Sequence, residues 1–178
     1  MFMRFAVVLV VAGMAVFGQA RSRKAHEHGS AKVSIAFETA TGAPKGVIAF
    51  EAPAESVVGF EHEAKSVADK TKVAAALRML AARFGEMVIL PAAAGCKISN
   101  QSAKVEAEKH DPKAKEQHSE VHAEFAVACA KPLAGLEIRF GFMKVFPKIH
   151  DVEVALLAGE QQSKADVEND KGVLKIAK

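Results

Sequence analysis

Apolar and polar residues alternate along several short segments of this chain, a pattern typical of β-strands with one buried face. Residues 32–38 alternate in this way, and a turn-forming stretch at 39–44 leads into a second strand expected at 46–51. The apolar face of the first strand consists of Val33, Ile35 and Phe37. The pattern therefore predicts two neighbouring strands joined by a turn.

One segment instead has the longer period of an amphipathic helix, which we expect at about 67–84. Ser66 and Asp69, three residues apart, resemble a capping box that starts the helix. Gly85 is the expected C-terminal stop. The apolar stripe is interpreted as core packing and comprises Val73, Leu77, Leu80 and Phe84.

Residues 96–107 and 118–129 have strand character and flank a charged, proline-containing stretch. If they pair as an antiparallel hairpin with Cys96 opposite Cys129, the centre falls just after the turn signal Asp111-Pro112. Directly opposed residues have Cα atoms about 4.5–5.5 Å apart, within reach of a disulfide. We expect this disulfide, with two buried free thiols or half of a thiolate metal site as the alternatives.

The remaining strands are shorter, and a polar connection separates the last two. They are expected at 87–90, 136–142, 152–158 and 173–176. Together these segments predict an α+β fold with a mainly antiparallel β-sheet, one principal helix (about 67–84) and a disulfide-stapled hairpin (96–129).

The first twenty residues predict a secretory signal peptide. Arg4 precedes an apolar run at 6–17, and Gly18-Gln19-Ala20 supplies the small residues of a cleavage site. The alternative is a membrane anchor, but this run of 12 residues is shorter than the ~20 that span a bilayer. We expect a signal peptide at 1–20, then a single periplasmic domain at 21–178 with no membrane span. Export to an oxidising compartment favours the disulfide.

Composition and motifs argue against several other functions. Half of the residues are apolar, and the net charge of +3 comes from interspersed acids and bases, so we expect no nucleic-acid partner. Nucleophile-elbow, phosphate-loop and dinucleotide motifs are absent from the sequence. The spacing of His118 and His122 resembles a metalloprotease motif, but Ser119 stands where that motif needs glutamate. We therefore expect a protein that is not an enzyme.

Histidines with acidic neighbours are the main candidates for chemistry. All seven histidines follow residue 20, and imidazole and carboxylate groups are the ligands that zinc uses when thiolates are tied up in a disulfide. A neighbouring carboxylate can also orient an imidazole ring. The groups are His26-Glu27-His28, Glu61-His62-Glu63, His110-Asp111, His118-Ser119-Glu120-Val121-His122 and His150-Asp151.

If 118–124 is a strand, its histidines and glutamates share one face. Glu120 and His122 would then lie about 6.6 Å apart and could share one ion. His118 and His122 would lie about 13 Å apart, too far for one ion on a straight strand. A solvated strand face explains the same pattern.

Several short motifs resemble the ZrgA-type family of periplasmic zinc-uptake proteins. The resemblance covers essentially the whole chain after residue 20, in consistent order. Its motifs are His26-Glu27-His28-Gly29, Gly59-Phe60-Glu61-His62, Leu90-Pro91-Ala92-Ala93-Ala94-Gly95-Cys96, His118-Ser119-Glu120-Val121-His122 before Cys129, and Phe146-Pro147.

The resemblance implies a periplasmic protein that binds Zn2+ and assists zinc acquisition, by buffering zinc or delivering it to an importer or the importer's binding protein. It also implies a loop rich in His and Asp between the two cysteine strands, which here is short and poor in both. A single site therefore fits better than high-capacity storage. Its expected ligands are His28, His62 and His122 with Glu120 or His118, and His26 is a further candidate.

Three other functions remain open. The chain could be a structural or interaction module of the envelope whose histidines are incidental. It could also carry copper or nickel, since the ligand types do not fix the metal. A zinc hydrolase would need an open coordination position with a base nearby.

Overall fold

The computed structural model describes residues 28–39, 41–107 and 118–178. The predicted signal peptide, His26, His110 and the turn signal at 111–112 lie outside the described residues. The strands are β1 (Ser30–Phe37), β2 (Lys45–Pro53), β3 (Val88–Ile89), β4 (Lys97–Ala107), β5 (Ser119–Ala128), β6 (Glu137–Phe140), β7 (Asp151–Ala158), β8 (Gln161–Glu168) and β9 (Val173–Lys175). The α-helices are α1 (Ala54–Val57) and α2 (Val67–Met87), and 3-10 turns occur at η1 (Ala92–Ala94) and η2 (Phe142–Lys144).

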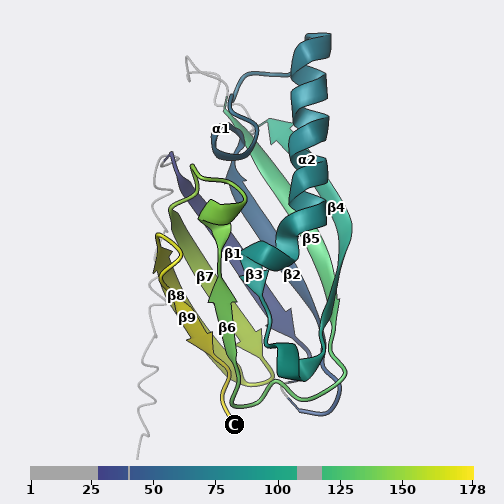
Figure 1. Cartoon of the computed structure of the whole chain (residues 1–178), viewed down its shortest axis with the longest axis vertical. Coiled ribbons are helices and arrows are strands. Elements are labelled where there is room, and N and C mark those ends of the chain that lie inside the picture. Colours follow the sequence, from purple (N-terminus) through teal and green to yellow (C-terminus); the bar gives the residue numbers. More distant parts are fainter. Residues whose placement is uncertain (1–27, 40, 108–117) are drawn as a thin grey trace, which may run out of the picture.

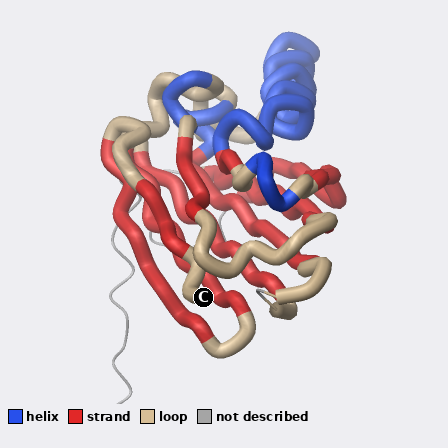
Figure 2. The backbone as a smooth tube through the Cα atoms, turned by 60° about the horizontal axis from the view of Figure 1, so that its bottom comes forward, coloured by secondary structure: helices blue, strands red, loops and turns tan. Residues whose placement is uncertain are grey.

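The strands form two sheets, of order β4-β5-β2-β1-β7-β8 and β3-β6-β9. All neighbouring strands are antiparallel except β1 and β7, which run parallel. The predicted α+β class with a mainly antiparallel sheet and one principal helix is confirmed. Figures 1 and 2 show α2 and the smaller sheet covering one face of the six-stranded sheet.

The core lies between the inner face of the large sheet and this covering layer. Strand β1 has the predicted alternation, with its apolar side chains buried. Phe84 of α2 stacks on Phe125 of β5 at a ring distance of 3.6 Å, and Phe50 of β2 meets Phe84 edge-on at 6.2 Å. Apolar burial of this kind is the main force that fixes α2 on the sheet.

Helix α2 starts as predicted, because the Ser66 side chain accepts a hydrogen bond from the Asp69 backbone N–H. The predicted stop at Gly85 is wrong, since the helix continues to Met87. Met87 is fully buried, and Arg83 forms two hydrogen bonds with Glu86, so packing and an ion pair outweigh the helix-breaking tendency of glycine.

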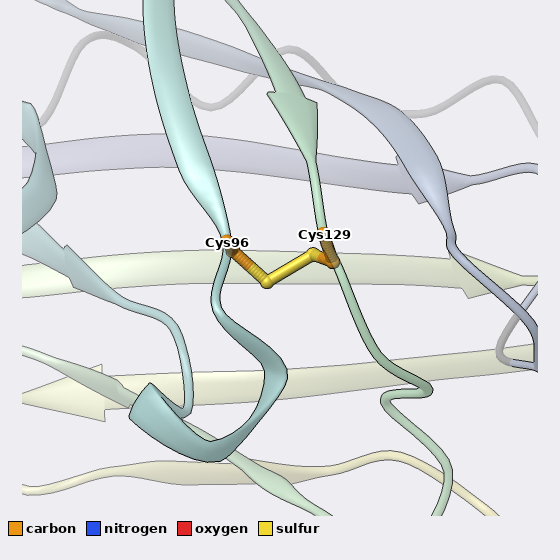
Figure 3. The surroundings of a disulfide bond; sticks show 2 residues. All are labelled: Cys96 and Cys129. Atoms are coloured by element: carbon orange, nitrogen blue, oxygen red, sulfur yellow. A yellow bond between two sulfur atoms is a disulfide. The ribbon is translucent and has the colours of Figure 1, made fainter.

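The Cys96–Cys129 disulfide and the β4–β5 hairpin are confirmed (Figure 3). Pairing follows the predicted register from Lys97 to Asn100, and then shifts by one residue at a bulge between Asn100 and Ser102. The shift keeps Ala103 and Val105 on the face of Ala123 and Val121, their cross-strand partners. It also places Lys104 and Glu106 on the outer face.

The polar connection predicted between the last two strands is itself a strand, β8, and this part of the prediction is wrong. Strand β8 is an edge strand that is held in place by its backbone pairing with β7, and only Val167 of its residues is buried. It therefore lacks the apolar alternation from which a strand is predicted. None of the helices in the described ranges is long and apolar enough to cross a membrane.

Candidate metal centre

The start of β1 lies against α1 and the connection from η2 to β7, at one end of the large sheet. The Gly29 N–H donates to the Ser56 side chain at 3.2 Å, and its carbonyl accepts from the backbone N–H groups of His150 and Asp151. Gly29 has a positive φ of 84°, and an added Cβ would overlap the His150 ring. These contacts fix the backbone next to His28.

Glu61, in the loop between α1 and α2, faces two histidines that are distant in sequence. Its Oε1 lies 3.6 Å from His28 Nδ1, and its Oε2 lies 2.5 Å from His118 Nδ1. The Glu61 side chain is 16% exposed, and Oε1 is buried without a hydrogen-bond partner in the part of the chain that the structure describes. We call His28, Glu61 and His118 the Glu61 group.

The two contacts of Glu61 differ in kind. A separation of 2.5 Å is that of a short hydrogen bond, so Glu61 orients the His118 ring. A separation of 3.6 Å is too long for a hydrogen bond but matches two ligands of one tetrahedral zinc ion, which lie roughly 3.3–3.6 Å apart for bonds of about 2.0–2.2 Å. The buried oxygen therefore fits a cation between Glu61 and His28.

Glu55 of α1 lies beside this group. Its Oε2 is 3.7 Å from His28 Nδ1, and its Oε1 accepts a short hydrogen bond from the Lys148 ammonium group. Ala54, Ser56 and Val57 are buried, so α1 holds Glu55 in place.

His122 forms a second group with glutamates from three adjacent strands. Its Nε2 lies 3.3 Å from Glu120 Oε2 and 4.0 Å from Glu106 Oε2, and its Nδ1 lies 3.9 Å from Glu51 Oε1. The hydrogen bond from Lys104 is the largest of the effects that hold the pKa of Glu106 below its usual range. We call His122, Glu120, Glu106 and Glu51 the His122 group.

His62 is the remaining predicted ligand in the described ranges, and its contacts there involve neither group. Its Nε2 lies 3.7 Å from Asp69 Oδ2, and its ring stacks on Phe60 at 4.4 Å. Because Asp69 belongs to the first turn of α2, these contacts tie His62 to the helix N-terminus. The structure thus brings His28 and His118 together, and places His122 with Glu120 in a separate group.

His28 also lines a cleft of about 270 Å³. Its lining includes His150 and Asp151, which the sequence had also marked. In the described ranges, no three His, Cys, Asp or Glu side chains are already placed to hold one metal ion together. Zinc binding by the Glu61 group therefore requires side-chain rotation, which the 66% exposed His28 side chain allows.

Sequence reasoning missed four of these carboxylates as ligand candidates. Glu61 stands directly before His62 in the Gly59-Phe60-Glu61-His62 motif. Its position beside a histidine could have identified it as a candidate ligand. Glu51 and Glu106 can be assigned only from strand register. Glu55 could not be identified from the sequence either, because its helix of four residues is too short to show a helical pattern.

Comparison with known proteins identifies the family. No curated protein matches the chain. A family model described as "ZrgA family zinc uptake protein" matches residues 25–176. The chain therefore belongs to the ZrgA family of zinc uptake proteins.

Proposed function

From membership of this family, we propose that the protein is a periplasmic zinc-binding protein that buffers zinc or delivers it to an importer. Zinc is its cargo, and the protein performs no catalysis. The disulfide and the zinc uptake family fit a protein outside the cytoplasm. The signal peptide predicted at 1–20 would carry it to the periplasm.

The observation that carries this proposal is Oε1 of Glu61, which is buried opposite His28 and has no hydrogen-bond partner among the described residues. A buried carboxylate oxygen without a partner is costly, and a cation bound between Glu61 and His28 removes that cost. His118, whose Nδ1 faces Glu61 Oε2, would supply a second imidazole nitrogen if it exchanged its hydrogen bond with Glu61 for a bond to the cation. His26, two residues before His28 in the sequence, remains a candidate for a further ligand.

The His122 group supports the same proposal in an accessory role. Glu106 and Glu120 are direct cross-strand partners, and like charges in this position repel each other. A cation held by His122 and Glu120 would reduce that repulsion. The side chains of Glu51 and Glu106 are about half exposed, so this group should hold zinc more weakly than the Glu61 group.

Zinc titration and growth assays test the proposal. Protein exported by its own leader and purified from the periplasm should bind zinc stoichiometrically at micromolar concentration. Cells lacking the gene should grow slowly under zinc chelation and recover with the wild-type gene, but not with Glu61→Gln. Absence of stoichiometric zinc uptake would contradict the proposal and favour the alternative of an envelope interaction module.

A further inference from the structure

Lys148 places a positive charge at the edge of the proposed zinc site. It lies between the buried residues Phe146 and Ile149, which anchor the chain on both sides. Two residues later, the His150 backbone N–H donates to the Gly29 carbonyl, beside His28. This short connection from η2 to β7 thus holds Lys148 near the site.

The two oxygens of Glu55 face different partners. Oε1 accepts a hydrogen bond from Lys148, while Oε2 lies 3.7 Å from His28 Nδ1. This separation is just beyond the roughly 3.3–3.6 Å between two ligands of one zinc ion, so a small movement of the exposed His28 ring would let both groups bind the same cation. Glu55 is therefore a carboxylate that zinc and the Lys148 ammonium group would both attract. The two charges cannot be fully satisfied by the same carboxylate at once.

We infer that Lys148 is an internal competitor of zinc that lowers the affinity of the Glu61 group and speeds zinc release. Its ammonium group occupies Glu55 when no zinc is bound, and it repels a dication at His28 and Glu61. On release, Lys148 neutralises Glu55 again, so the acidic site does not retain the metal. This inference rests on the proposed function and adds a reason why the site suits delivery rather than storage.

Replacing the ammonium group while keeping the length of the side chain tests the inference. Lys148→Met should bind zinc about three- to tenfold more tightly than wild type, and should release it correspondingly more slowly to a chelator. Lys148→Arg keeps the charge and should stay within about twofold of wild type. Lys148 is 54% exposed, so the fold should tolerate the change, and Lys148→Gln serves if Lys148→Met misfolds.

Lys164→Met is the matched control for net charge. Lys164 forms a 3.2 Å ion pair with Glu153 on the outer face, and its side chain is exposed to a similar extent. This variant should bind zinc as wild type does. In a Glu55→Gln background, Lys148→Met should have a much smaller effect, because the shared carboxylate charge is already absent.

The outcomes separate the inference from the function on which it rests. If Glu61→Gln weakens zinc binding while Lys148→Met leaves the affinity unchanged or lower, only the inference is overturned. If Glu61→Gln has no effect, the site itself is misassigned and the inference fails with it. An equal gain in affinity from Lys164→Met would also overturn the inference, because it would reveal a general charge effect.

Discussion

The Nδ1 atom of His118 lies 2.5 Å from Oε2 of Glu61, although 57 positions separate them in sequence. This contact joins the start of β5 to the loop between α1 and α2. The other carboxylate oxygen of Glu61 faces His28, at the start of β1. Glu61 therefore links three distant segments, and the first prediction concerns its charge.

Glu61→Gln should lower zinc affinity about 10- to 100-fold, as loss of a carboxylate that orients a liganding histidine typically does. Calorimetric titration measures the effect. Glu63→Gln is the matched control, because Glu63 is exposed and forms an ion pair with Lys65. Equal losses in the two variants would show that the effect comes from general negative charge.

The histidines should differ in importance according to their contacts. His118→Ala should weaken zinc binding strongly, whereas His62→Ala should change the affinity by less than about twofold, because His62 contacts Asp69 and Phe60. His122→Ala should have an intermediate effect. Parallel titrations of the three variants test this order, and a larger loss for His62→Ala than for His118→Ala would contradict the assignment.

The elements that could be predicted from sequence are those whose pattern directly records burial. The apolar side chains of β1 face the core, as do Leu80 and Phe84 of the predicted α2 stripe, and the disulfide fixes the start of the β4–β5 register. Strand β8 could not be predicted because an edge strand with only Val167 buried carries almost no apolar signal.

The site was predictable in composition but not in geometry. Histidines beside carboxylates could be identified in the sequence, but the partner of each depends on strand register and loop position. The bulge after Asn100 places Glu106, rather than Val105, opposite Glu120, which no periodicity signals. Likewise, Glu61 contacts His118 because the α1–α2 loop folds back over the start of β5.

The disulfide should stabilise the fold without contributing to zinc binding. It closes a segment with a sequence separation of 33, so replacing both cysteines by serine should cost ~3–4 kcal/mol of unfolding free energy in urea denaturation. The bridge lies at the opposite end of the hairpin from His118, roughly 35 Å along the strands. The folded variant should therefore retain wild-type zinc affinity, and a large loss would show that the hairpin transmits strain to the site.

The Ser66 cap should stabilise the first turns of α2 rather than the whole fold. All buried residues of α2 lie from Ala76 onward, so Ser66→Ala should speed hydrogen exchange at 67–75 while amides near Phe84 remain protected. The hydrogen bond from Ser66 holds the pKa of Asp69 below its usual value of 3.8. The stabilisation from this bond is thus present above pH 3.8 and is lost as the pH falls through the lowered pKa of Asp69. The difference between wild type and variant should shrink over that range.

Gly29 connects backbone conformation to zinc affinity. Gly29 and Gly42 both have positive φ, so alanine should cost about 1 kcal/mol of backbone strain at either position. An added Cβ at Gly42 meets nothing within 4 Å, whereas at Gly29 it overlaps the His150 ring. Gly29→Ala should therefore lower the melting temperature more than Gly42→Ala, and should also weaken zinc binding because it displaces the backbone beside His28. If Gly29→Ala is destabilised but keeps wild-type zinc affinity, His28 is not held in place for zinc by this turn.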